Sequence, residues 1–315
     1  MSKDKYTKPE FSFSLLHPKH WGVWLGFGSL AIIVNILPYS LLYKFGRSLG
    51  TLGLKYGKKR AAITERNLEL AFPEQTKEER DAIVLENFKN TGMAIIETGI
   101  TWFWPTWRFK RIIVEKDIHV LHEHKAANKG VLLCCVHALN LEITARAFAV
   151  LGVGGYGVYR PHKNPAYNFI QHWGRTHNGN LLIDRKDVKQ MIRVLRKGAR
   201  LFYLPDHDYG RNKSVFVPFF AVPDASTTTG TSIIAHTSKC AIVPGSGFRN
   251  RHGQYDIIAD TSIEQDYPRD ETAAAAYMNT YVEQIIMRAP AQWMWLHKRF
   301  KTMADPSQPK GIRYQ

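Results

Sequence analysis

The sequence predicts an α/β protein with a mostly parallel central sheet flanked by helices, preceded by an N-terminal membrane helix. Three observations support this fold class. Apolar runs of strand length alternate with helix-like segments from residue 131 onward, which is typical of parallel strands joined by helical crossovers. Residues 21–37 contain no charged side chain. The 315 residues are enough to bury a sizeable core.

The net charge narrows the range of partners. The chain has 43 Lys and Arg against 27 Asp and Glu, which gives +16. This balance favours nucleic acid, an anionic bilayer, a phosphorylated substrate or an acidic protein. Hydrophobic residues make up 44%, which argues against a polytopic membrane protein and a disordered chain. Cys134, Cys135 and Cys240 are expected to be reduced thiols of a cytosolic domain, because three cysteines give no disulfide framework.

We divide the chain into a polar lead (residues 1–20), a transmembrane helix (21–43) and a single α/β domain (44–315). The uncharged stretch is at the short end for a spanning helix, and residues 38–42 extend it. Four lysines precede it and six Lys or Arg follow it closely, which orients the main domain toward the cytoplasm. The alternative is a buried core helix of a soluble domain.

Two helices are expected between this span and the sheet. Residues 40–60 form an amphipathic pattern with a basic face, able to lie at the level of the lipid headgroups. Residues 73–104 predict a long amphipathic helix. Thr76 and Glu79 supply a capping-box signal at its start, and Pro105 ends it.

The sheet and its covering helices follow. Strands are expected at 131–136, 155–160, 180–184, 200–205, 240–248 and 254–260, with helices at 140–151, 165–177, 188–197 and 272–287. Active sites of such sheets lie beyond the carboxyl ends of the strands. Because His137, Arg160 and Asp206 each lie at or just past such an end, we expect their chemistry to belong together.

His137 and Glu142 form a local pattern that suggests catalysis: a histidine followed five positions later by a glutamate. Residues five apart on a helix lie roughly 140° apart, so the two side chains cannot share one face of a regular helix. They can meet if His137 precedes the helix and Glu142 occupies its first turn, with Asn140 as the N-cap. Glu142 would then hold one imidazole nitrogen and leave the other to accept a proton. The alternative is a hydrogen-bonded histidine with a structural role.

Other patterns predict little additional chemistry. His119, His122 and His124 are expected on a solvated helix face, and "PDHDYG" (205–210) is a weak metal signal, so we expect no metal site. The chain lacks a phosphate loop, a G-x-G-x-x-G motif and a serine nucleophile elbow. No nucleic-acid-binding signature is present, so nucleic acid is not an expected partner. "WMWLHKRFK" (293–301) is either a core edge or a phosphate-binding segment.

The H-x4-D/E pattern on a basic, membrane-associated chain resembles the bacterial glycerolipid acyltransferases. The whole chain resembles more closely the late acyltransferases of lipid A biosynthesis, in the lauroyl/palmitoleoyl transferase branch. The resemblance covers nearly the whole chain. It lies in the blocks "LLHPKHWGVWLGFG" (15–28), "RNLELAFPE" (66–74), "ETGITWFWP" (97–105), "VHALNLE" (136–142), "GVYRPHKNP" (157–165), "DRKDVKQMI" (184–192), "PDHDYGRNKSVFVPFFAV" (205–222), "TTTGT" (227–231) and "MWLHKRFKT" (294–302).

This resemblance implies transfer of a fatty acyl chain, of lauroyl to palmitoyl length, from acyl carrier protein to a 3-hydroxyacyl hydroxyl of Kdo-lipid IVA, without cofactor or metal. It implies a single-pass protein of the bacterial inner membrane with its catalytic domain in the cytoplasm. By motif, His137 is the general base and Glu142 its orienting partner. Arg175 and Asp206 are active-site residues, Asp206 as a residue that orients a base or an arginine, and Arg160 contacts an oxyanion or a phosphate.

Two alternative functions remain open from the sequence. The first is acylation of a glycerophospholipid, against which Glu142 weighs because it stands where an aspartate would be expected. The second is a non-catalytic membrane-surface protein that binds lipid. That function would make His137 dispensable.

Overall fold

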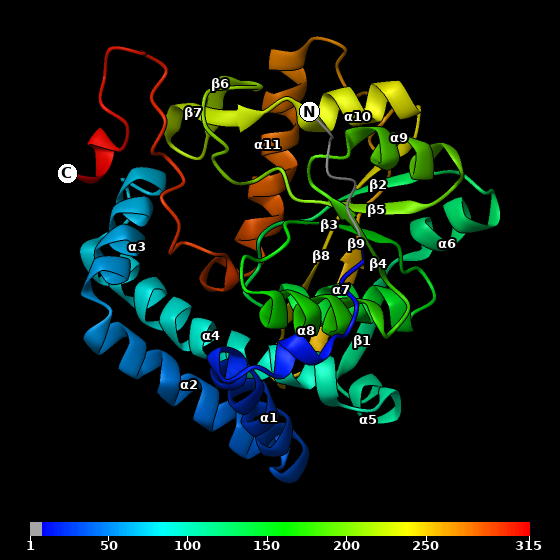
Figure 1. Ribbon diagram of the computed structural model, residues 1–315. Coiled ribbons are helices and arrows are strands. Elements are labelled where there is room, and N and C mark those ends of the chain that lie inside the picture. Colours follow the sequence, from blue (N-terminus) through cyan, green and yellow to red (C-terminus); the bar gives the residue numbers. More distant parts are fainter. Residues whose placement is uncertain (1–7) are drawn as a thin grey trace.

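The computed structural model describes residues 8–315. A seven-stranded sheet with the order β1-β9-β8-β2-β5-β3-β4 lies at its centre, with helices on both faces (Figure 1). Its strand pairs are parallel except β8 with β9. The predicted α/β class with a mostly parallel central sheet is therefore confirmed.

All six predicted strands are present, and three further strands were not predicted. The sheet consists of β1 (Ile113–Asp117), β2 (Val131–Cys134), β3 (Tyr156–Tyr159), β4 (Leu181–Asp184), β5 (Arg200–Tyr203), β8 (Ala241–Arg249) and β9 (Tyr255–Ala259). The unpredicted strands are β1 at the sheet edge and a separate antiparallel hairpin, β6 (Ser214–Phe219) with β7 (Val222–Thr228).

Strand β2 shows why the strands at the centre of the sheet read as unbroken apolar runs. All four of its residues are buried, because helices cover both faces of the sheet. Leu132 and Cys134 belong to the core that includes residues of α9 (Val188–Arg196), α10 (Gly230–Ser238) and α11 (Glu271–Met287). Val131 and Leu133 belong to the core that includes residues of α6 (His119–Ala126) and α7 (Leu141–Val150).

The predicted helix at 73–104 is α4 (Lys77–Phe103). Both hydrogen bonds of its capping box form: Glu79 N–H donates to Thr76 Oγ1, and Thr76 N–H donates to Glu79 Oε2 at 2.8 Å. Three further helices are α3 (Lys58–Ala71), α5 (Thr106–Lys110) and α8 (Pro165–Thr176).

The N-terminal apolar segment differs from the prediction. Instead of one helix over 21–43, the chain forms α1 (Trp21–Ile36) and α2 (Tyr39–Tyr56). Leu37 is extended, with ψ 143°, because a residue before proline avoids the helical region and Pro38 follows it. Within residues 8–315 no helix is both long and apolar enough to cross a bilayer. The predicted spanning helix is therefore not supported.

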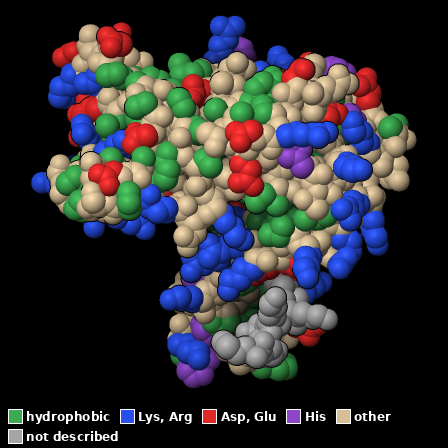
Figure 2. All heavy atoms as spheres, turned by 90° about the horizontal axis from the view of Figure 1, so that it is seen from above, with side chains coloured by type: hydrophobic (Ala, Val, Ile, Leu, Met, Phe, Trp, Pro, Cys, Tyr) green, Lys and Arg blue, Asp and Glu red, His purple; other side chains and the backbone are tan. Residues whose placement is uncertain are grey.

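The sheet order brings the predicted site residues together. Strand β5 lies between β2 and β3, so the loops that follow these three strands meet at one edge of the sheet. His137 follows β2, Asp206 follows β5 and Arg160 follows β3. In the view from above, Lys and Arg side chains are spread over much of the visible face (Figure 2).

The capping box yields a stability prediction. Thr76→Ala removes the side-chain oxygen that accepts from the start of α4, and we expect it to lower the free energy of unfolding by about 1 kcal/mol. Thr76→Ser keeps the oxygen and should retain most of the stability. Chemical denaturation of the three proteins in detergent gives the comparison. Equal stability of the alanine and serine variants would contradict the assignment.

Candidate active site

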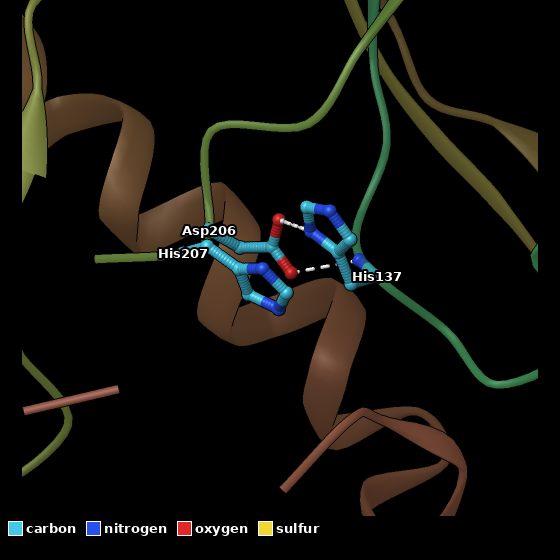
Figure 3. Close-up of side chains that lie close together, drawn as sticks. All are labelled: His137, Asp206 and His207. Atoms are coloured by element: carbon cyan, nitrogen blue, oxygen red, sulfur yellow. Dashed lines mark hydrogen bonds and ion pairs between the residues drawn. The ribbon is translucent and has the colours of Figure 1, made fainter. Parts of the chain in front are cut away.

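His137 and Asp206 form a paired base and carboxylate. Nδ1 of His137 lies 2.7 Å from Oδ1 of Asp206, and the backbone N–H of His137 donates to Oδ2 at 2.7 Å (Figure 3). In the described chain, Nε2 of His137 has no protein partner among the hydrogen bonds. A carboxylate on one imidazole nitrogen fixes the tautomer and leaves the other nitrogen to accept a proton. The arrangement is that of a general base.

Asp206 is fully buried and stays ionised. Trp293 donates a further hydrogen bond from Nε1 to Oδ2 at 2.6 Å. Burial by itself raises the pKa of Asp206, but His137, through its charge and hydrogen bond, together with His207 and Trp293, lowers it by more. The net pKa lies well below the ordinary value, so the site keeps a negative charge beside the imidazole.

A second histidine lies flat against the first. The rings of His137 and His207 are 3.5 Å apart between centroids and within 7° of parallel, and His297 in turn stacks on His207, with centroids 4.8 Å apart. Burial, and then the charge of His137, lower the pKa of His207 to about 3. His207 is therefore neutral at physiological pH. It restrains the plane of the His137 ring without adding a competing charge.

Glu142 does not hold the imidazole as the sequence predicts. It lies in the first turn of α7, as expected, but within residues 8–315 no hydrogen bond joins it to His137. Its Oε1 accepts from Nε of Arg175 at 2.8 Å, and its Oε2 accepts from Nε1 of Trp102 at 3.1 Å. Asp206 takes the place predicted for Glu142, because β5 lies next to β2 and brings Asp206 against the ring.

Arg175 is the charged partner of Glu142. Burial alone lowers the pKa of Arg175, but the charge and hydrogen bond of Glu142 raise it above the ordinary value, so the pair remains ionic.

Asn140 occupies the N-cap position of α7, but its side chain makes no capping hydrogen bond. It donates instead to the carbonyl of Gly247 on β8 at 3.0 Å, which ties the start of α7 to the sheet.

Two adjoining cavities are lined by four of the five predicted residues, and the buried Asp206 lines neither. His137 and Arg160 line a cavity of about 440 Å³. Glu142 and Arg175 line a smaller cavity of about 90 Å³, and Val158 and Leu204 line both. Arg160 therefore shares the cavity of the base, whereas the Glu142–Arg175 pair lies beside it, across a shared wall.

The sequence interpretation missed Trp293 and His207. Both lie in segments that the sequence analysis singled out, "WMWLHKRFK" and "PDHDYG". A local sequence pattern cannot reveal a contact such as that of Trp293 with Asp206, which lie 87 positions apart. The phosphate-binding alternative for residues 293–301 is not favoured by the contacts of its cations. Arg299 is buried and donates to the carbonyl of Ser226, and Lys301 donates to that of Asp208.

Within residues 8–315, one cluster of potential metal ligands is found, and it consists of His137, Asp206 and His207. Ligand atoms of His137, Asp206 and His207 all lie within 4.8 Å of one another. The Asp206 carboxylate already accepts three hydrogen bonds. The lone pairs of the two imidazoles lie in nearly parallel planes, so they do not converge as tetrahedral ligands must. The geometry fits a base and its carboxylate better than a metal centre.

The fold and the site are typical of one class of protein: an α/β enzyme with a histidine–carboxylate pair at the carboxyl edge of its sheet. Comparison with known proteins gives the reaction. Residues 8–302 match the family described as bacterial lipid A biosynthesis acyltransferase. The chain belongs to this family and is an acyltransferase.

Relatives match over nearly their whole length. The lipid A biosynthesis lauroyltransferase of Escherichia coli (strain K12) is 44% identical over 96% of this chain and 97% of its own. A lipid A biosynthesis acyltransferase of Haemophilus influenzae is 43% identical over the same shares. The lipid A biosynthesis palmitoleoyltransferase of E. coli (strain K12) is 38% identical over 94% of this chain and 96% of its own.

The neutral His207 predicts how stability depends on acid. Its pKa is about 3 in the folded protein and about 6.5 in an unfolded chain. The unfolded state therefore binds more protons below about pH 6.5. The contribution of neutral His207 to the free energy of unfolding is lost as pH falls from about 6.5 toward 3. His207→Phe keeps a flat ring without the titration. We expect its free energy of unfolding to fall less steeply over this range; parallel curves for both proteins would refute the prediction.

Proposed function

We propose that this protein transfers a fatty acyl chain from acyl carrier protein to a 3-hydroxyacyl hydroxyl of Kdo-lipid IVA at the bacterial inner membrane. The observation that carries the proposal is the His137–Asp206 pair at the wall of a ligand-sized cavity. The names of the relatives, which specify lauroyl and palmitoleoyl transfer in lipid A biosynthesis, support it.

The reaction follows from the position of the base. The acceptor hydroxyl binds at Nε2 of His137, which takes its proton as the oxygen attacks the thioester carbonyl carbon. The C–S bond of the tetrahedral intermediate then breaks, and the leaving thiolate takes the proton back from His137. The products are an ester and a free thiol. Asp206 stays ionised throughout and stabilises the protonated ring, so the scheme uses no acyl-enzyme, cofactor or metal.

The arginines have separate roles in this scheme. Arg160 shares the His137 cavity and contacts the oxyanion or a phosphate of the acceptor. Glu142 fixes Arg175 through a charge-assisted hydrogen bond. Glu142 is thus a positioning residue for Arg175, and Asp206 is the positioning residue for His137.

The charges around the cavity suit the proposed substrates. Arg160, Arg185 and Lys213 line it, and no acidic side chain does. Within residues 8–315 none of the three cations takes part in an ion pair or a side-chain hydrogen bond. Unpaired cations at a cavity mouth attract anions, which supports a phosphorylated acceptor and an acidic carrier protein as partners.

Helices α1 and α2 supply a surface for inner-membrane lipids. Helix α1 has no charged residue, and it exposes Trp21, Leu25, Ile32 and Ile36, whose spacing places them on one face. Helix α2 repeats the pattern with exposed side chains at Leu41, Phe45, Leu52 and Tyr56. No acidic residue occurs between Glu10 and Glu65. This combination suits an anionic bilayer, with the catalytic domain on its cytoplasmic side.

The central test measures turnover of purified protein with lauroyl-acyl carrier protein and Kdo-lipid IVA. We expect His137→Ala to lower kcat by about 10²–10⁴-fold, the usual range for loss of general-base catalysis, and Asp206→Asn to cause a loss of the same order. His252→Ala, in an exposed loop, is the matched control. Near-normal turnover of His137→Ala would overturn the mechanism.

The alternative functions are separated in the same assay. Product from lysophosphatidic acid, but not from Kdo-lipid IVA, would identify a glycerophospholipid acyltransferase. Binding of Kdo-lipid IVA without ester formation by wild-type protein would identify a lipid-binding protein instead.

Glu142 and Arg175 should behave as one unit. Because their carboxylate–guanidinium pair is held by direct hydrogen bonds, Glu142→Gln and Arg175→Gln should each lower kcat/KM, and the double variant should lose little more than the worse single variant. Glu142→Gln combined with Asp206→Asn gives the comparison between residues that share no contact. Strictly additive losses for Glu142 and Arg175 would contradict the pairing.

A further inference from the structure

The cavity that contains His137 has a charged mouth and an apolar floor. Its cations, Arg160, Arg185 and Lys213, belong to exposed residues. The least exposed of its lining side chains are Met191 of α9 and Ile234 of α10, each 2% exposed, followed by Tyr159 next to Arg160, at 3%. Its volume of about 440 Å³ lies within the range of about 300–1,000 Å³ typical of ligand pockets.

A thioester placed at His137 needs an apolar space for its acyl chain. The adjoining cavity is a poorer candidate, because it measures only about 90 Å³ and its wall includes the Glu142–Arg175 ion pair with Asn178 and Asn180. The larger cavity is lined by the aliphatic side chains of Val158, Val188, Leu204 and Ile233 in addition to Met191 and Ile234, together with three tyrosines. Burial of methylene groups favours this second location.

We propose that Met191 and Ile234 form the floor of the acyl-chain site and set the longest chain that this enzyme transfers. The inference rests on the proposed acyl transfer at His137 and adds the residues that select the acyl group. The names of the relatives, which specify lauroyl, palmitoleoyl and myristoyl groups, show that this choice differs within the family.

The packing of the floor explains how it can limit length. Met191 and Ile234 come from two helices that contact each other, and both belong to the core cluster that includes Leu132 of β2. A chain that reaches them must displace close-packed core side chains to go further, and cores resist added methylenes. A shorter chain leaves apolar surface unfilled and loses burial. Both effects select chains that just reach the floor.

The test is a competition among decanoyl, lauroyl, myristoyl and palmitoyl donors on acyl carrier protein with Kdo-lipid IVA, read by mass spectrometry of the product. We expect Ile234→Phe to raise the ratio of shorter to longer products by about tenfold, and Met191→Ala to shift it toward longer chains by about tenfold, since one methylene in an apolar pocket changes kcat/KM by that factor or more. Ile234→Val is a milder enlargement if Met191→Ala proves unstable.

Matched variants distinguish the floor from a general loss of packing. Leu195 is as buried as Met191 and lies one turn further along α9, outside the cavity lining; Leu195→Ala should lower the melting temperature and leave the product ratio unchanged. Ala145 lines the adjoining cavity and Ala149, one turn along α7, does not, so Ala145→Leu against Ala149→Leu tests the rival location.

Unchanged ratios in folded Ile234→Phe and Met191→Ala, or a shift caused by Ala145→Leu alone, would overturn the proposal while wild-type transfer still supported the proposed function. Absence of transfer by wild-type protein from every donor would instead refute the proposed function itself.

Discussion

The buried carboxylate of Asp206 is the group on which the site depends. It accepts hydrogen bonds from the backbone and ring of His137 and from the indole of Trp293, so it joins the ends of β2 and β5 to the C-terminal segment. The segment is secured to the same loop by its own backbone, since Leu139 N–H donates to Gln292 and Met294 N–H donates to His137. A buried charge is tolerated only when its hydrogen bonds are satisfied, and here satisfying them also positions the base.

A second set of contacts joins α1, the helix proposed to contact lipid, to the site. Phe27 of α1 stacks on Trp102 of α4, with centroids 5.1 Å apart, and the indole of Trp102 donates to Glu142, which holds Arg175. Gly174 permits this approach, because a Cβ there would lie 2.2 Å from the Trp102 ring. Helix α1 is therefore packed against Trp102, whose indole donates to the carboxylate that holds Arg175.

The sequence predicted the strands well where burial on both faces left an unbroken apolar run, as in β2. It missed β1, because Glu115, Lys116 and Asp117 mask an edge strand. It placed His137 and Asp206 correctly at strand ends but paired His137 with Glu142, the nearer residue in sequence. The actual partner depends on β5 lying beside β2, and strand order is a property of the whole sheet that local pattern does not contain. The prediction of one helix over residues 21–43 was wrong for a local reason. Leu37, before Pro38, is extended and ends α1, and the hydropathy of the stretch gives no sign of this break.

The distribution of charge explains how one cavity can serve both chemistry and binding. In the proposed mechanism, a proton taken by His137 places positive charge beside the ionised Asp206 and the uncharged ring of His207, and the carboxylate stabilises that charge. Asp206 therefore offsets the charge that forms on His137 without help from Arg160, Arg185 or Lys213. Those cations line the cavity with no carboxylate among its lining residues, and their charge remains available to an anionic substrate. Separating the charge pair that does chemistry from the cations that recruit substrate lets the base keep a fixed environment whether or not the mouth is occupied.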